Sequence, residues 1–520
     1  MALSWKGGQS TKGGIMKKLF REEAREIEIF DECDILICGG GSAGHSAAIA
    51  AARAGAKNII LLERYGYMGG DVTGGYVIMV PHHSYKKLQY VRGLQEEWFQ
   101  RLSKVPGSVM GPEGEELGRT DPETIDKWIP FWDCTSNCPD SPKRVVRSVY
   151  FEPNQLKIEM DKMLLEEKAN IRVYCHSWAC RPIMEGDAVK GVIFESKEGR
   201  KAILAKVVID ATGDGDIFSK AGARSSEEKE ADIERNISTA LVFRIGGIDF
   251  ERFSRNNIKH PEQNVKIRTE LKNFVRGNGL VPLPSERNDV CWMNNWIKPV
   301  NCIDVKDITD TEMMIRDNIR DIIAYLKENA VGFENAFLYD SAPQLGSRCS
   351  RRLVGEYVLD PMDFVNHREF DDVIAWHSTI CRLNDSAPIE LPYRIILPEK
   401  IDNLLCPGRH MSCDAKSFDW VGLIPQCIGT GQAAGIAAAV ATEQGTTVRD
   451  VDIKRVQDIL VEQDVPLPRR KDVDPDYTEL LEENQYGLYT ELAKLAKEHP
   501  EEVFQYRQVR PTAKQIMQGQ

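Results

Sequence analysis

Arginines are concentrated in one short segment of this sequence and could bind an anion. Gly346–Arg352 contains three of them, and Arg348 and Arg351 are our candidates for a catalytic or substrate-holding role. Planar guanidinium groups bind carboxylates and other anions through paired hydrogen bonds. The alternative is a structural ion-pair cluster with Glu356 and Asp360, which would also bring these charges together.

Two histidine positions could supply a proton donor or acceptor. His410 precedes Asp414 and Asp419, either of which could serve as its carboxylate partner. His83 is a secondary candidate beside His82, and both follow a glycine-rich stretch. A lone histidine is more often a packing or hydrogen-bonding residue, and paired histidines on a loop are more often solvated. Each position therefore has a structural alternative.

The elements that must position such groups begin with a strand–turn–helix–strand pattern near the N-terminus. It comprises a buried strand, a glycine turn, a helix, a second strand and an acid, over Ile35–Cys38, Gly39–Gly44, Ser46–Ala54, Asn58–Leu62 and Glu63. In this fingerprint the glycines allow a tight turn and a close approach to a pyrophosphate, while the helix N-terminus faces the phosphates. The acid is placed to bind a ribose hydroxyl. The pattern therefore predicts a dinucleotide site rather than a glycine-rich turn without a ligand.

The segments that follow distinguish between the possible dinucleotides. Arg64–Gly75 is rich in glycine and forms no helix, so its backbone is free to line an extended cofactor. In the segment Val207–Asp216, Val207–Asp210 reads as a buried strand, and Ala211–Gly213 at its carboxyl end should lie beside that cofactor. Together with Gly346–Arg352 and Asn403–Gly435, these segments resemble the FAD-dependent oxidoreductase family related to the fumarate reductase and succinate dehydrogenase flavoproteins.

The resemblance implies that FAD is the cofactor and that the arginine segment faces an interdomain cleft. No His or Cys lies between Arg64 and Gly75, where some relatives attach flavin covalently, so we expect non-covalent binding. A helix beginning at Gly429 would aim its free N–H groups at the flavin. The residues expected to bind FAD are Gly39, Gly41, Ser42, Ala43, Gly44, Glu63, Arg64, Gly69, Gly70, Thr73, Gly74, Ala211, Thr212, Gly213, Asp216, Gly408, Arg409, Gly429, Thr430 and Gly431.

The expected function is hydride transfer between flavin N5 and a small polar organic substrate. The reaction would be alcohol or C–C dehydrogenation, or reduction of an activated double bond, with an external electron carrier completing it. The sequence has Ala415 and Gly422 where relatives commonly carry His and Arg, which favours a substrate different from theirs. The alternative is a flavoprotein electron-transfer subunit of a larger redox complex. A homo-oligomer is expected by resemblance.

Composition disfavours several other classes of protein. The net charge of −12 argues against nucleic acid as a partner, because phosphate binding needs a basic face. The sequence has no apolar run of membrane-spanning length, and its first residues lack the apolar stretch of a secretory signal. The 13 cysteines include no Cys-x-x-Cys pair, so we expect reduced thiols in a cytoplasmic protein and no metal site.

We therefore expect an α/β protein with a Rossmann-like FAD-binding domain of the glutathione-reductase type, an inserted α+β substrate domain and a helical C-terminal tail. The expected boundaries are 1–29 for a polar lead-in, 30–224 and 396–445 for the two parts of the FAD-binding domain, 225–395 for the substrate domain and 446–520 for the tail.

Overall fold

The computed structural model describes most of the chain between residues 20 and 468. The described residues are 20, 22–81, 83–85, 87–136, 143–227, 239–275, 277–297, 300–348, 350–360, 362–363, 368–377 and 389–468. His82, most of the expected lead-in and most of the expected C-terminal tail lie outside them.

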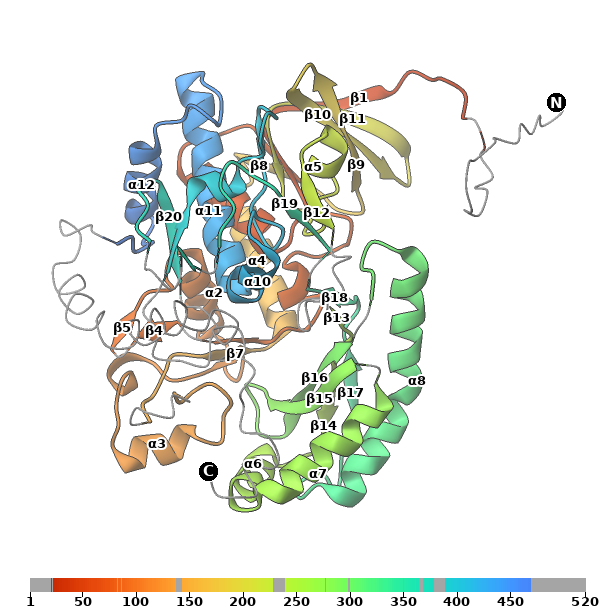
Figure 1. Ribbon diagram of the computed structural model, residues 1–520, viewed down its shortest axis with the longest axis vertical. Coiled ribbons are helices and arrows are strands. Elements are labelled where there is room, and N and C mark those ends of the chain that lie inside the picture. The colour runs from red at the N-terminus through yellow and green to blue at the C-terminus, as the bar shows by residue number, and fades with distance from the viewer. Residues whose placement is uncertain are drawn as a thin grey trace.

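A seven-stranded, mainly parallel sheet forms the centre of one lobe, at the top of Figure 1. Its order is β8-β2-β1-β11-β10-β9, and β22 pairs with the last residues of β11. The strands are β1 (Glu28–Cys38), β2 (Ile59–Leu62), β8 (Ile171–Tyr174), β9 (Trp178–Glu185), β10 (Ala188–Ser196), β11 (Gly199–Asp210) and β22 (Leu404–Leu405). Parallel strands bury both faces, which is why the last residues of β1 and all of β2 are buried.

The registers bring the ends of the parallel strands to one edge of this sheet. Cys38 at the end of β1 lies opposite Leu62 of β2 and Asp210 of β11. Ligands of open α/β sheets bind at this carboxyl edge. The turns that follow these three strands are therefore placed side by side.

Two helices of small residues pack tightly beside the sheet. Helix α1 (Ser42–Arg53) follows β1 and contacts α11 (Ile424–Gln444) along its length. A Cβ atom on Gly431 would lie 2.2 Å from the Ala43 carbonyl oxygen, and one on Gly435 would lie 2.1 Å from that of Ala47. Only glycine permits so close a contact between the two backbones.

An antiparallel sheet of six strands forms the second lobe. Its order is β17-β14-β16-β13-β18, and β15 pairs with β16. Figure 1 shows α6 and α7 beside this sheet at the bottom of the molecule and α8 along its outer side. The elements are β13 (Thr239–Ala240), β14 (Phe243–Gly246), β15 (Gly277–Pro284), β16 (Val290–Ile297), β17 (Phe337–Ser341), β18 (Gly346–Ser347), α6 (Phe250–Lys259), α7 (Pro261–Leu271) and α8 (Val305–Asn329).

Smaller elements pack around the two sheets and between them. They include a three-stranded sheet, three strand pairs and several helices. These are β3 (Met79–Val80), β4 (Ser84–Tyr85), β5 (Leu88–Gln89), β6 (Val109–Met110), β7 (Val149–Phe151), β12 (Ser225–Glu227), β19 (Arg351–Leu353), β20 (Val373–His377), β21 (Ile389–Pro392), α2 (Leu94–Leu102), α3 (Pro122–Trp128), α4 (Pro153–Glu166), α5 (Phe218–Ala221), α10 (Ala415–Val421) and α12 (Ile453–Glu462), with the 3₁₀ turns η1 (Gly70–Val72), η2 (Gly114–Glu116), η3 (Lys272–Phe274) and η4 (Tyr393–Ile396).

Two helix starts differ from those expected. Helix α1 begins at Ser42, directly after the glycine turn, rather than at Ser46. Helix α11 begins at Ile424 with Pro425 in its first turn, rather than at Gly429. Proline is favoured in a first helical turn because its missing N–H has no partner to lose there. Gly429 therefore lies inside the helix and does not begin it.

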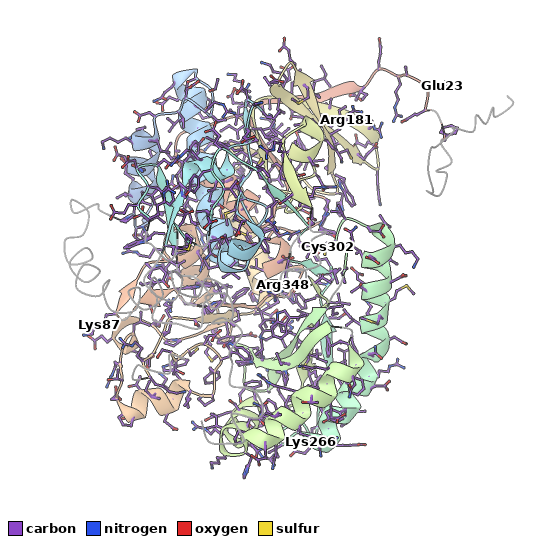
Figure 2. All side chains as sticks on the ribbon, viewed as in Figure 1. Glu23, Lys87, Arg181, Lys266, Cys302 and Arg348 are labelled. Carbon is purple, nitrogen blue, oxygen red and sulfur yellow. The ribbon has the colours of Figure 1, made fainter. Side chains whose placement is uncertain are left out.

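One continuous apolar core runs through both lobes, and a second cluster packs on the other face of the parallel sheet. Figure 2 shows Cys302 and Arg348 between the lobes, with Arg181 and Lys266 at opposite ends of the molecule. Among the helices of the described residues, none combines the length and apolar character that crossing a membrane would require.

Candidate functional site

A cavity of about 1500 Å³ extends from the carboxyl edge of the parallel sheet to the antiparallel sheet. The turns after β1, β2, β11 and β22 form one side of it, and residues of β15, β16 and α6 form the other. Ligand pockets commonly measure about 300–1,000 Å³. This cavity is therefore large enough for a cofactor and a second molecule.

The glycine turn opens the N-terminus of α1 toward this cavity. Gly41 is the residue before the helix, no side chain caps it, and Gly41, Ser42 and Ala43 all line the cavity. Gly39 has a φ of 99°, and a Cβ atom there would lie 2.5 Å from the Ala211 carbonyl oxygen. The first N–H groups of a helix bind anions well, so this uncapped end could hold a diphosphate.

Glu63 is fixed beside the same turn. Its Oε2 accepts a hydrogen bond from the Gly40 N–H at 2.6 Å, and its Oε1 accepts one from the Tyr65 N–H at 2.8 Å. The residue is only 6% exposed yet lines the cavity. Burial raises the pKa of Glu63, while the two N–H donors limit the rise. The carboxylate is thus oriented before any ligand arrives and could accept hydrogen bonds from ribose hydroxyls.

Aromatic and cationic groups lie next to Glu63. The Arg64 guanidinium lies 5.0 Å from the ring centre of Tyr65 and 5.2 Å from that of Trp178. All three residues line the cavity, as does Ser177. Because β8 runs parallel to β2, the segment after β8 comes beside Glu63. The sequence analysis missed Trp178 and Ser177, although the position of the segment after a parallel strand was the signal that could have found them.

An ion-pair network lies where the cavity passes between the lobes. Arg409 binds Asp71 at 3.1 Å and Asp214 at 2.8 Å, and its Nε donates to the Gly213 carbonyl at 2.8 Å. Asp214 also accepts a hydrogen bond from the Ser350 hydroxyl at 2.6 Å. Arg409 and Asp71 line the cavity. The two carboxylates therefore hold Arg409 in one orientation at the cavity wall.

The two carboxylates of this network differ in their pKa. Burial raises the pKa of Asp71 above its usual value, although Arg409 opposes the rise. Burial acts on Asp214 in the same direction, but Arg409 and the Ser350 hydroxyl outweigh it, and the pKa of Asp214 is lowered. Asp71 is consequently the carboxylate better suited to exchanging a proton with a molecule in the cavity.

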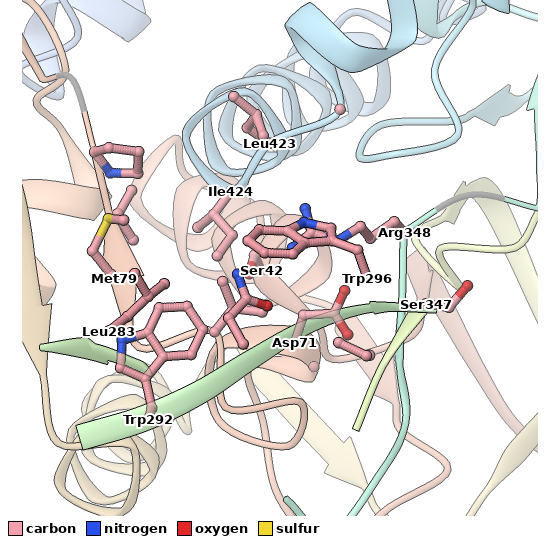
Figure 3. Close-up of a pocket in the computed structure, with 18 of the residues that line it drawn as sticks. Ser42, Asp71, Met79, Leu283, Trp292, Trp296, Ser347, Arg348, Leu423 and Ile424 are labelled. Atoms are coloured by element: carbon pink, nitrogen blue, oxygen red, sulfur yellow. The ribbon is translucent and has the colours of Figure 1, made fainter. Parts of the chain in front are cut away.

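The expected catalytic residues do not gather at one place. Arg348 lines the cavity, and its guanidinium lies 6.0 Å from the ring centre of Trp296. Figure 3 shows Arg348 beside Trp296, with Asp71 and Ser347 nearby. Arg351 lies outside the lining and donates to the Asp214 carbonyl oxygen at 3.0 Å. Of the two arginines, only Arg348 is placed to contact a ligand.

Both candidate histidines also lie away from the cavity lining. His410 is fully buried, its Nε2 donates to the Asp210 carbonyl at 2.9 Å, and its ring meets Phe218 edge to face. His83 is fully buried as well, stacks on Phe99 and accepts a hydrogen bond from Gln95 at 2.9 Å. These contacts are those of packing residues, which was the structural alternative for His410. For His83 the alternative was a solvated loop residue, and its burial shows that this expectation was wrong.

Most of the residues expected to bind FAD line the cavity. They are Gly39, Gly41, Ser42, Ala43, Glu63, Arg64, Gly70, Ala211, Thr212, Gly213, Asp216, Gly408 and Arg409. The others lie outside the lining and contact neighbouring protein segments: Gly44, Gly69, Thr73, Gly74, Gly429, Thr430 and Gly431. The Thr430 hydroxyl, for example, accepts a hydrogen bond from the Gly408 N–H at 3.1 Å. At the helix, Ile424 and Pro425 line the cavity in place of the three expected residues.

These features fit FAD, because an uncapped helix N-terminus and a preoriented acid open onto one elongated cavity. Comparison with known proteins decides the family. The family described as FAD dependent oxidoreductase matches residues 34–460. The chain belongs to the FAD-dependent oxidoreductase family. It is accordingly an FAD-dependent oxidoreductase enzyme with an α/β FAD-binding fold.

Individual relatives are more distant from this oxidoreductase. Urocanate reductase of Eggerthella lenta is 42% identical over 79 residues, which are 15% of this chain and 11% of that protein. A geranylgeranyl bacteriochlorophyll reductase-like protein of Thermoplasma acidophilum is 15% identical, with a TM-score of 0.43 over 91% of this chain and 98% of that one. L-proline dehydrogenase of P. horikoshii is 13% identical, with a TM-score of 0.37 over 84% and 99%. Likeness at this level does not indicate the reaction.

Proposed function

We propose that this oxidoreductase binds FAD non-covalently along the cavity and transfers a hydride between flavin N5 and an organic substrate held by the antiparallel sheet. The single observation that carries the proposal is the continuity of the cavity. It joins the uncapped end of α1 and Glu63 to the Arg409–Asp71 pair and then to β16. Flavin N5 accepts or donates the hydride itself, so the protein supplies positions, protons and charges.

The residues of the parallel sheet would hold the cofactor. The N–H groups of Ser42 and Ala43 would face the diphosphate, Glu63 would accept hydrogen bonds from ribose hydroxyls, and Trp178 and Tyr65 would flank the adenosine end. Arg409, held by two carboxylates, places a fixed positive charge between the lobes. All of these residues would hold FAD through non-covalent contacts.

Asp71 is the group we propose to accept or donate the proton that accompanies hydride transfer. It lines the cavity, and burial raises its pKa toward the range in which proton exchange is efficient. Arg348 lies across from it and could orient the reacting group of the substrate. Asp71 replaces His410 in this role because the histidine has no surface on the cavity.

The test is anaerobic bleaching of the flavin by candidate alcohols and saturated acids, followed by variants. Asp71→Asn should slow bleaching by any active compound at least tenfold, while dithionite still reduces the flavin at the wild-type rate. His410→Asn serves as the comparison and should retain bleaching in folded protein. Unchanged bleaching in Asp71→Asn would contradict the assignment. Absence of bleaching by every compound, with normal reduction by dithionite, would favour the electron-transfer alternative.

A further inference from the structure

One wall of the cavity is a two-stranded apolar surface. Along β16, Trp292, Asn294 and Trp296 alternate with residues that point into the core, so their side chains share one face. On β15, Leu283 lies opposite Trp292, Val281 opposite Asn294, and Gly279 opposite Trp296. Residues directly opposite each other in an antiparallel pair share a face. These six residues, all lining the cavity, are the indole wall.

The indole wall has no charged side chain. Its one amide is Asn294, which is 5% exposed and whose Oδ1 has no hydrogen-bond partner among the described residues. Gly279 leaves the ring of Trp296 uncovered, because a Cβ atom there would lie 3.5 Å from the indole Cε3. Trp292 is only 2% exposed and its Nε1 has no hydrogen-bond partner among the described residues, so Trp296 provides the indole face that is open to the cavity.

Apolar side chains from other segments extend this wall. Met79 of β3 and Ile424 of α11 line the cavity, and Figure 3 shows both with Trp292 and Leu283 around the same space. Farther along, Phe253 of α6 also lines it. Figure 3 places the charged residues Asp71 and Arg348 beside Trp296, and Arg268 of α7 and Lys272 of η3 also line the cavity. A molecule that packs on the indole wall can therefore place one polar group beside Asp71 and Arg348 while its body contacts Met79, Ile424 and the wall.

We propose that the substrate of this oxidoreductase has an apolar body of aromatic or alicyclic ring size that packs on the indole wall, with a single polar reacting group at the Asp71 end. This inference rests on the proposed function. It revises the expectation of a small polar substrate. A polyol or a small polyacid would lose its water at this wall and could regain hydrogen bonds there only from Asn294 and the Trp292 Nε1–H. A ring would instead pack on the indole of Trp296.

The test is calorimetric titration of the oxidised, FAD-loaded enzyme, which needs no turnover. The probes are benzyl alcohol, 2-phenylethanol and 3-phenylpropanol, with glycerol and erythritol as polar comparisons. Affinity should rise about fourfold with each added methylene, and binding should show a negative heat-capacity change. The polyols should bind at least tenfold more weakly than 3-phenylpropanol. Equal or tighter binding of the polyols, or no increase along the aromatic series, would overturn the proposal.

Variants locate the binding. Gly279→Val fills the space over Trp296 without deleting a core side chain, and Trp296→Ser removes the ring. Each variant should weaken the binding of 3-phenylpropanol at least fivefold while FAD stays bound. Trp296→Phe should restore most of the affinity. Leu338→Asn is the matched control, because Leu338 is 46% exposed on β17 of the same sheet and lies outside the cavity lining. Unchanged binding in both Gly279→Val and Trp296→Ser would contradict the site.

The two proposals fail in different ways. If aromatic alcohols bind as described but no compound bleaches the flavin, hydride transfer fails and the binding class stands. If a polyol or a small polyacid bleaches the flavin rapidly and binds more tightly than 3-phenylpropanol, hydride transfer stands and the apolar class is wrong.

Discussion

Glu63 shows how a single side chain can be prepared for a ligand by the backbone around it. Two N–H groups hold its oxygens, and its position follows directly from the end of β2. The acid was predictable from the sequence because it stands at a fixed distance after the glycine turn. The proposed role of Asp71 could not be predicted in this way, because it depends on the ion pair with Arg409, a residue distant in the chain.

Replacing Glu63 by alanine should weaken FAD binding roughly ten- to hundredfold. The variant would remove the carboxylate proposed to accept from the ribose hydroxyls, and a hydrogen bond to a charged group contributes about 1.5–3 kcal/mol. It would also remove the acceptor that holds the N–H groups of Gly40 and Tyr65 in place. Fluorescence titration of deflavinated protein with FAD measures the change. Glu63→Gln keeps an acceptor oxygen and should lose less affinity for FAD than Glu63→Ala. Wild-type affinity in Glu63→Ala would show that the acid does not contact the cofactor.

Glu286 should make the folded protein more stable at mildly acidic pH than at pH 8. It is 8% exposed, neither carboxylate oxygen has a hydrogen-bond partner among the described residues, and burial raises its pKa from 4.5 to about 7. A raised pKa in the folded state means that the ionised form opposes folding above about pH 7, and that the penalty disappears as pH falls toward 4.5. A shift of this size corresponds to at most about 3 kcal/mol.

The check is urea unfolding of wild type and Glu286→Gln between pH 5.5 and 8, compared through their difference in unfolding free energy. The glutamine variant stays uncharged, so its advantage should be largest at pH 8 and shrink as the pH is lowered. An advantage that does not change with pH would mean that Glu286 titrates normally.

At the scale of elements, Arg244 joins the two lobes. It is 1% exposed on β14, and its Nε donates to Asp340 of β17 at 2.8 Å. The same guanidinium binds Glu152, which precedes α4 of the other lobe, and lies 5.0 Å from the ring centre of Tyr76. One cation therefore serves carboxylates from both lobes. These partners are far apart in the sequence, so no local pattern indicated the link.

Arg244→Met should lower the unfolding free energy by about 3 kcal/mol, because it leaves Glu152 and Asp340 facing each other without a cation. Urea unfolding at pH 7.5 measures the loss. Arg244→Lys keeps the charge but not the forked geometry and should lose less. If the methionine variant proves as stable as wild type, the ion pairs do not hold the lobes together.

Local signals explain which elements the sequence predicted. The β1–α1–β2 pattern was recognisable because its turn, helix and strands are each specified by neighbouring residues. The start of α11 was predicted at the wrong residue because its glycines are required by a contact with a distant segment, not by the start of a helix. Gly431 and Gly435 accommodate α1, a contact that depends on the pairing of two distant helices. The indole wall could not be predicted from the sequence either, since the alternation of Trp292, Asn294 and Trp296 does not indicate which face of the sheet lines the cavity.

At the scale of the whole molecule, a parallel sheet whose turns line the proposed FAD site faces an antiparallel sheet that lines the proposed substrate space, and one cavity runs between them. This division explains why the cofactor was predictable and the substrate was not. The proposed cofactor half has turns with a recurring sequence pattern, whereas the proposed substrate half would use one face of an otherwise ordinary antiparallel sheet. The external electron carrier, the homo-oligomer and the cytoplasmic location stay predictions.

The most direct test of this account is the flavin content of the purified, full-length protein. We predict one FAD per chain by absorbance, released intact into the supernatant when the protein is denatured, and reduced content in Glu63→Ala purified alongside. A colourless protein that takes up no FAD on reconstitution would contradict the account, and so would a flavin that remains attached to the denatured chain.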